Sequence, residues 1–264
     1  MKKIVSFLLT IAMVFALTAC AGKSGADAKT DMEYVKEKGT LVVGITDFAP
    51  MDYKDDNGNW IGFDADMATA FAEKLGVKVE FVEIEWDYKA TELQNKSIDV
   101  VWNGMTLTDE VKATMDCSNA YCNNAQIVIV PADKADQYQT IDSIKGLQFA
   151  VEAGSAGKAV AEKNNFTFKE VAKQADAVME VKAGTSSAAI IDSLMAAAMV
   201  GEGTSYADLT YTVQLNSEEY GVGFRQGSDL VAELNKFFVE SYADGSMLKL
   251  AEKYGTQASI IEQK

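Results

Sequence analysis

Carboxylates are the side chains of this sequence best placed to do chemistry, because the chain contains no histidine. Without an imidazole, proton transfer would fall to an acid such as Asp87, Glu152 or Asp192. No second carboxylate is fixed by spacing beside Asp192. The acidic loop 55–58 suggests calcium, but Trp60 stands where an EF-hand requires glycine, so we interpret the loop as an Asn-Gly hairpin turn. We therefore expect no metal site and no cofactor.

The overall charge excludes a further class of function. The 264 residues include 39 Asp and Glu against 24 Lys and Arg, which gives a formal net charge of −15. Such a surface repels nucleic acid, so a binder of phosphate backbones is excluded. Arg225 is the only arginine. With 48% hydrophobic residues, the chain can bury the core of one large domain or two modest ones.

The N-terminus has the pattern of an export signal. Two lysines precede an apolar run from residue 4 to residue 17, which is too short for a permanent membrane span but suits a signal-peptide core. The run ends in Leu-Thr-Ala-Cys at 17–20, which resembles a bacterial lipobox. We predict a signal peptide at 1–19, a lipid on Cys20, and a flexible tether over 20–34. The alternative is an ordinary secretory signal that contains a cysteine.

Export has two consequences. Removal of residues 1–19 takes away two lysines and no acids, which changes the net charge from −15 to −17. We expect the remainder at the extracytoplasmic face of the cell membrane, attached through Cys20. There Cys117 and Cys122 either close a small disulfide loop or remain two separate thiols, and their spacing leaves both alternatives open.

Strands and helices alternate along the rest of the chain. Apolar and β-branched runs predict strands at 41–46, 77–82, 98–102, 127–130, 147–151, 188–191 and 211–215, and the segment 220–224 is interpreted as the return of the chain to the first lobe. Four-residue periodicity predicts a helix that begins at Asp64 and ends before Gly76. Other helices are expected at 88–95, 230–242 and 247–254.

This alternation predicts an α/β fold of two lobes, each a mixed sheet flanked by helices. Lobe 1 is expected to comprise 35–129 and 223–264, and lobe 2 to comprise 130–222. Two hinge crossings are expected, near 128–132 and 219–223. Ligands bind beyond the carboxyl ends of strands in such sheets, so we expect the ligand in a cleft between the lobes.

Several motifs in order resemble those of the family 3 extracellular solute-binding proteins, the amino-acid receptors of ABC importers. The matching segments are 48–50, 62–67, 86–87, 104–110, 151–155, 190–192 and 220–227, and the resemblance covers roughly residues 35–258. Ala65 and Phe71 are small departures from the usual pattern. The resemblance implies the periplasmic-binding-protein type II fold, which closes by a hinge around its ligand. It also implies a monomer that delivers its ligand to an ABC permease and its ATPase.

The resemblance further implies which residues of lobe 1 contact the ligand. Phe48 and Trp86 would sandwich it between aromatic faces. The Gly104 carbonyl and the Thr106 hydroxyl would accept hydrogen bonds from its ammonium group. Asp87 would line the same cleft. The structural alternatives are core aromatics for the first two residues, a local turn or helix cap for Thr106 and an ordinary surface acid for Asp87.

From lobe 2, Asp192 would form a charge-assisted pair with the ammonium group. Its alternative is the N-cap of the helix that follows. Ser155 and the backbone of Ala156, at a helix start, would contact the ligand's carboxylate.

One departure from the family pattern affects the ligand. The family motif Thr-x-Thr-x-x-Arg places an arginine that grips the α-carboxylate, and Val111 stands at that position. Arg225 lies in the return segment and cannot replace it. Either Lys112 and helix-terminal amides hold the carboxylate, or the ligand has none. Four acids near the expected cleft favour a cationic or amine ligand: Asp47, Asp87, Glu152 and Asp192. The alternative for Asp47, Asp87 and Glu152 is that they are ordinary surface acids.

The leading hypothesis is a lipid-anchored protein that binds a small amino-acid-like solute and delivers it to an ABC importer. A first alternative is the same pocket binding an amine or another cationic solute without an α-carboxylate. A second is a metal-free dehydratase or lyase on the same scaffold, since that fold hosts cyclohexadienyl dehydratases. A third is a sensory module that presents its ligand to a membrane receptor.

Overall fold

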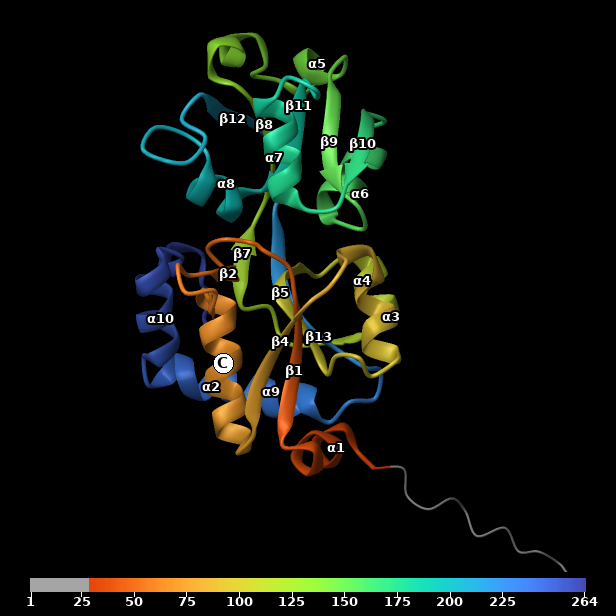
Figure 1. Ribbon diagram of the computed structural model, residues 1–264, viewed down its shortest axis with the longest axis vertical. Helices are drawn as coiled ribbons and strands as arrows, with labels where there is room; N and C mark the ends of the chain where they lie inside the picture. Colours follow the sequence, from red (N-terminus) through yellow and green to blue (C-terminus); the bar gives the residue numbers. More distant parts are fainter. Residues whose placement is uncertain (1–28) are drawn as a thin grey trace, which may run out of the picture.

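The structure is a computed structural model that describes residues 29–264, so the predicted signal peptide and Cys20 lie outside the described residues. Across 29–264, no helix is long and apolar enough to cross a membrane. The described chain forms two α/β lobes joined by two extended segments (Figure 1). The predicted fold class is therefore confirmed.

Lobe 1 is built on a sheet with the strand order β4-β1-β5-β13-β6, and β7 also pairs with β13. The first three strands run parallel, whereas β13 is antiparallel to its neighbours. The strands are β1 (Thr40–Ile45), β4 (Lys78–Glu83), β5 (Val100–Thr106), β6 (Asp116–Cys117), β7 (Cys122–Asn124) and β13 (Glu218–Phe224). The hairpin predicted at the Asn-Gly turn joins β2 (Tyr53–Lys54) to β3 (Trp60–Ile61).

Helices cover both faces of this sheet (Figure 1). Alternation along β5 explains why: Val100 and Trp102 pack into one apolar cluster, whereas Val101 and Met105 pack into another. The first face carries α2 (Phe63–Leu75), α9 (Leu230–Ala243) and α10 (Ser246–Tyr254). The second carries the turn η1 (Trp86–Tyr88), α3 (Lys89–Gln94) and α4 (Asp109–Thr114). Gly76 ends α2, as the sequence predicted, and it adopts the left-handed conformation there.

Lobe 2 has the strand order β10-β9-β11-β8-β12. Its strands are β8 (Gln126–Pro131), β9 (Gln148–Glu152), β10 (Thr167–Val171), β11 (Ala188–Asp192) and β12 (Leu209–Gln214). Its helices are α5 (Ile141–Ile144), α6 (Ala156–Lys163), α7 (Gln174–Lys182) and α8 (Ser193–Met199), with the turn η2 (Ala132–Gln137). A last turn, η3 (Gln257–Ser259), belongs to lobe 1.

The crossings between the lobes lie earlier in the chain than predicted. The first is at Ala125, between β7 and β8, and the second spans 215–217, between β12 and β13. The predicted boundaries at 129/130 and 222/223 therefore shift by about five residues. The reason is that the apolar run 127–130 is an interior strand of the second sheet, and β13 already pairs with β7 of the first sheet from Glu218 onward.

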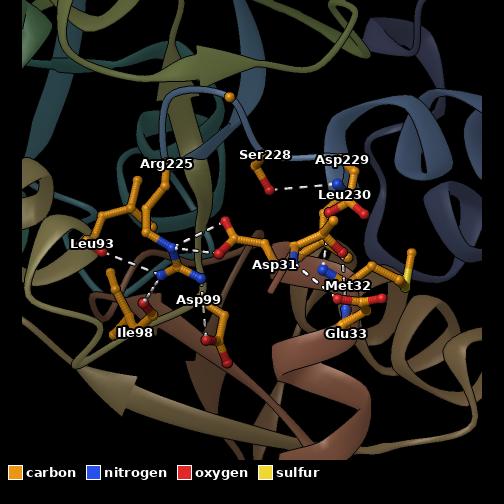
Figure 2. A network of polar contacts seen from close by, with 12 residues as sticks. Asp31, Met32, Glu33, Leu93, Ile98, Asp99, Arg225, Ser228, Asp229 and Leu230 are labelled. Atoms are coloured by element: carbon orange, nitrogen blue, oxygen red, sulfur yellow. Dashed lines mark hydrogen bonds and ion pairs between the residues drawn. The ribbon is translucent and has the colours of Figure 1, made fainter. Parts of the chain in front are cut away.

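The predicted tether also ends earlier than residue 34. The helix α1 (Asp31–Lys38) begins directly after Thr30, whose side chain accepts a hydrogen bond from the Glu33 N–H in a capping box. The only arginine holds this helix on lobe 1 (Figure 2). The Arg225 Nε donates to both carboxylate oxygens of Asp31 at 3.0 Å.

Arg225 also binds the main body of lobe 1. Its Nη1 donates to the carbonyl oxygens of Ile98 at 2.8 Å and Leu93 at 3.2 Å, and its Nη2 lies 3.5 Å from Asp99 (Figure 2). Asp99 is fully buried and also accepts from Lys38 at 2.5 Å. The single arginine is therefore a structural residue of lobe 1.

Cys117 and Cys122 are both free thiols. They pair with Gly223 and Tyr220 of β13, positions three residues apart on one strand. At about 3.3 Å per residue, this register separates the two cysteines by much more than a disulfide spans. Of the two alternatives, the structure has the separate thiols.

Candidate functional site

A cavity of about 300 Å³ lies between the lobes, at the lower end of the range for small-molecule pockets. Lobe 1 contributes the loop after β1, the start of α3, the end of β5 and α4. Lobe 2 contributes the turn after β9, the start of α6 and the end of β11. The structure brings all eight predicted contact residues to this cavity: Phe48, Trp86, Asp87, Gly104, Thr106, Ser155, Ala156 and Asp192.

Two aromatic side chains form the lobe 1 wall. Phe48 and Trp86 line the cavity and are only 3% and 8% exposed. The Phe48 ring packs edge-on against Tyr220, with ring centroids 6.3 Å apart. Gly104 makes room for it, because a Cβ there would lie 2.3 Å from the Phe48 Cε1, and its φ of +52° is unfavourable for other residues. A side chain at Gly104 would therefore displace the aromatic wall.

Asp192 is the most heavily hydrogen-bonded acid of the cavity. It stands at the N-cap position of α8, yet its side chain makes no capping hydrogen bond, so the cap alternative is wrong. Instead its carboxylate accepts from the Tyr220 hydroxyl at 2.8 Å and the Gln126 amide at 2.9 Å. The side-chain amides of Asn124 and Gln174 also donate to it. Its charge is thus held in place by four donors from two lobes.

Glu218, the first residue of β13, belongs to the same polar network. Its Oε1 accepts from the Asn124 amide at 2.7 Å, the Gln126 amide at 2.8 Å and the Thr106 hydroxyl at 2.9 Å. Burial, followed by repulsion from Glu218, raises the pKa of Asp192 to about 7. Because the Thr106 hydroxyl donates its proton to Glu218, its lone pairs remain as acceptors on the cavity side.

Two further acids approach the cavity from opposite lobes. Glu152, at the end of β9, is 3% exposed, and burial and then the charge of Asp192 raise its pKa to about 8, against the lowering effect of Lys89. Asp87 is exposed on the lobe 1 side. A Cβ on Gly154 would lie 2.7 Å from the Asp87 Cα, so the two lobes are in contact here.

The helix α6 begins at the cavity. Ser155 is its N-cap, and its hydroxyl oxygen accepts a hydrogen bond from the Lys158 N–H at 3.1 Å. Ala156 is the first residue of the helix, where backbone N–H groups have no acceptor within the helix. This end of α6 can therefore donate to an anion in the cavity.

The position expected for a carboxylate-binding arginine is apolar. Val111 lines the cavity but packs into the cluster that contains Trp86 and Leu93. Lys112 is exposed and does not line the cavity, so it does not replace the arginine. Asp47 is also exposed and outside the lining.

Sequence reasoning missed the residues whose partners lie far along the chain. Gln174 donates to Asp192 from α7, and Glu218 shares donors with it across the hinge. Lys89 was also missed, although it lies next to the Trp86-Asp87 motif on the same short segment. Its position beside that motif was the one feature of the sequence that could have identified Lys89 as a cavity residue.

The charge of the lining is strongly unbalanced. Among the described residues, Lys89 is its single cation, against five acids: Asp87, Asp109, Glu110, Glu152 and Asp192. Within residues 29–264, no cluster of His, Cys, Asp or Glu is arranged to hold a metal ion. Aromatic faces and carboxylates together are suited to a small cation or to a zwitterion with a cationic side chain.

Comparison with known proteins places this geometry in a family. Residues 41–257 match the family described as bacterial extracellular solute-binding proteins, family 3. The chain is 31% identical over 265 residues to the arginine-binding extracellular protein ArtP of Bacillus subtilis, a match that covers 97% of this chain and 99% of ArtP.

Solved structures agree with the sequence match. An ABC-transporter substrate-binding protein from Streptococcus pneumoniae with bound histidine has a TM-score of 0.80 and 29% identity, covering 87% of this chain and 98% of that one. An ancestral arginine-binding protein bound to arginine has a TM-score of 0.75 and 35% identity, covering 82% and 98%. These relatives are binding proteins rather than enzymes. The chain belongs to family 3 of the bacterial extracellular solute-binding proteins.

Proposed function

We propose that this amino-acid-binding protein of an ABC uptake system binds a basic L-amino acid, with L-arginine as the first candidate. The observation that carries the proposal is the inter-lobe cavity, where five carboxylates and two aromatic faces meet a single cation. A guanidinium or ammonium side chain would neutralise part of this charge and stack on an aromatic face.

Each predicted contact has a role in this proposal. Phe48 and Trp86 enclose the ligand, while Asp192 pairs with its α-ammonium group. The Thr106 hydroxyl and the Gly104 carbonyl accept from the same ammonium. The remaining acids face the cationic side chain, and Ser155 and Ala156 lie where the α-carboxylate would meet the start of α6.

The relatives support an amino acid with a basic side chain. ArtP is named as an arginine-binding protein, and the ancestral relative was solved with arginine bound. The histidine-bound structure and an Escherichia coli relative named as L-cystine-binding widen the class. Arginine, lysine, ornithine, histidine and cystine therefore form the test panel.

Ligand-induced stabilisation of the purified protein tests the proposal. Thermal unfolding is measured after ligand stripping, with each member of the panel and with neutral and acidic amino acids as controls. A rise in Tm with at least one basic amino acid is expected, and Trp86→Ala and Asp192→Ala should each remove it while the unliganded protein stays folded. If glutamate and leucine stabilise as strongly as arginine, the charge argument is wrong.

Val111 favours a second candidate, an amine without an α-carboxylate. The same measurement separates the two, because agmatine is arginine without its carboxylate. A larger shift with agmatine than with L-arginine would support the amine.

We also propose that the chain is held at the extracytoplasmic face of the membrane by a lipid on Cys20, which lies outside the described residues. Labelling of the full chain with a radioactive fatty acid in the host should mark the wild type and not Cys20→Ser. Equal labelling of both proteins, or none, would overturn the anchor and leave the binding proposal intact.

A further inference from the structure

A zwitterionic ligand brings a carboxylate into a cavity that already contains five. A carboxylate that leaves water needs a charged or hydrogen-bonding partner, because an unpaired buried charge is costly. Val111 cannot supply one, and Lys112 and Arg225 do not line the cavity. Within residues 29–264, Lys89 is the one cationic side chain that does.

The contacts of Lys89 leave it free to bind an anion. It is half-buried at the start of α3, and its Nζ donates to the Gly154 carbonyl at 2.9 Å and to the Trp86 carbonyl at 3.2 Å. Among the described residues, no carboxylate lies within ion-pair distance of it, although acids surround the cavity. An ammonium group has three protons, so one remains unused.

The position of Lys89 matches the position predicted for the ligand's carboxylate. Its hydrogen-bond acceptor Gly154 directly precedes Ser155, the N-cap of α6. The ammonium from lobe 1 and the first N–H groups of α6 from lobe 2 therefore converge on one region of the cavity. The ammonium also lies 4.9 Å from the centre of the Trp86 ring, which orients the lysine side chain toward the aromatic wall.

Burial lowers the pKa of Lys89, while the negative charges of Glu152, Glu110 and Asp87 oppose that effect. These acids favour the charged ammonium but do not contact it. A ligand carboxylate would be a closer partner than any of them.

We propose that Lys89 is the specificity-determining residue that binds the ligand's α-carboxylate, in place of the missing arginine. The inference rests on the proposed function, since it requires an amino acid as the ligand. Lys89 then gives the protein a higher affinity for amino acids than for the amines that lack the α-carboxylate. Because the same ammonium also donates to the Gly154 carbonyl, a carboxylate bound to it is held by a side chain that contacts both lobes.

The test combines ligand pairs that differ only in the carboxylate with substitutions of Lys89. Calorimetry measures the affinities of the wild type, Lys89→Met and Lys89→Arg for L-arginine and agmatine, L-lysine and cadaverine, and L-histidine and histamine. We expect Lys89→Met to bind the amino acid of the recognised pair ~10- to 100-fold more weakly, and its amine within about threefold of wild type or more tightly. Lys89→Arg should keep most of the affinity for the amino acid.

The outcomes separate this role from others. Equal weakening of amino acid and amine in Lys89→Met means that Lys89 only connects the lobes, and overturns the proposal. Unchanged amino-acid affinity, or a wild type that prefers the amine, overturns it as well. Retained amine binding shows that the variant is folded. A wild type that binds none of the six compounds, and neither ornithine nor cystine, overturns the proposed function itself, and the carboxylate role with it.

Discussion

The carboxylates of Asp192 and Glu218 accept hydrogen bonds from the same two side-chain amides, those of Asn124 and Gln126. Asp192 ends a strand of lobe 2, Glu218 begins a strand of lobe 1, and the two amides flank the first crossing. The hinge and the ligand cavity therefore share one polar network. Asp192, which is predicted to bind the ligand, therefore accepts hydrogen bonds from Asn124 and Gln126 at the hinge.

We expect loss of a bridging amide to destabilise the protein. In Gln126→Leu, Asp192 and Glu218 each lose a donor in a largely buried site, which should lower the free energy of unfolding by ~1–3 kcal/mol. Gln139→Leu is the matched control, because its amide donates to the Ala135 carbonyl at an exposed site. Its effect should stay within about 0.5 kcal/mol in urea unfolding. Equal effects of the two variants would contradict a stabilising network.

Affinity for a basic amino acid should rise with pH between 6 and 8. The raised pKa values, about 7 for Asp192 and about 8 for Glu152, keep these carboxyls partly protonated in the free protein. A cationic ligand binds the ionised forms, so ionisation of Asp192 alone should make it bind roughly tenfold more tightly at pH 8 than at pH 6, and ionisation of Glu152 should add to this rise. Binding at pH 7 should release protons, measured by calorimetry in buffers of different ionisation enthalpy. Identical heats in all buffers would exclude this coupling.

The same groups set the pH dependence of the unliganded protein. Their folded pKa values lie above those of the unfolded chain, so the folded state holds more protons between about pH 4 and pH 8. Their contribution to stability is therefore fully present below pH 4 and is lost as the pH rises through 7 and 8. We expect a lower free energy of unfolding at pH 8.5 than at pH 6 for the ligand-free protein, and a smaller difference in Asp192→Asn.

Gly104→Ala should damage the binding site through Phe48. The added methyl group would lie 2.3 Å from the ring, and the resulting shift should cost ~1–3 kcal/mol and weaken ligand binding about tenfold. Gly76→Ala separates the clash from backbone strain, because Gly76 also has a positive φ but nothing within 4 Å of the added Cβ. We expect that control to lose about 1 kcal/mol of stability and no affinity. Equal losses of affinity would mean that strain alone is responsible.

Arg225→Met should lower stability without changing ligand affinity. It leaves Asp31 without its partner and removes one of two cations beside the fully buried Asp99, which should cost about 3 kcal/mol. Lys145→Met, which breaks an exposed pair with Asp142, should cost less than about 0.5 kcal/mol. Urea unfolding and calorimetry measure the two effects. A large loss of affinity in Arg225→Met would contradict the separation of this residue from the cavity.

Local pattern accounts for much of the fold. The apolar runs identified seven of the longer strands, and periodicity with a terminal glycine identified α2. The edge strand β10 was missed because none of its five residues is fully buried and two of them, Lys169 and Glu170, are charged. The crossings were displaced because an apolar run such as 127–130 does not reveal which sheet it joins.

The cavity was predicted less completely than the fold. Motifs in order identified residues from both lobes, because each motif lies at the end of a strand. The partners of Asp192 could not be found in this way, since Asn124 and Gln126 are more than sixty residues away and ordinary amides in sequence. Lys89 was overlooked because one lysine on a helix usually faces solvent, and only its contact with Gly154 reveals that it faces the other lobe.

The attachment of α1 also has a mechanical consequence. Asp31 is bound by Arg225, and the next backbone N–H, that of Met32, donates to Asp229 at 2.9 Å (Figure 2). A pull on the N-terminus therefore acts first on these two contacts, which connect α1 to the body of lobe 1. Within residues 29–264, the chain passes between lobe 1 and lobe 2 only at the two crossings. In a chain held by its N-terminus, lobe 1 is the fixed lobe and lobe 2 is the moving one.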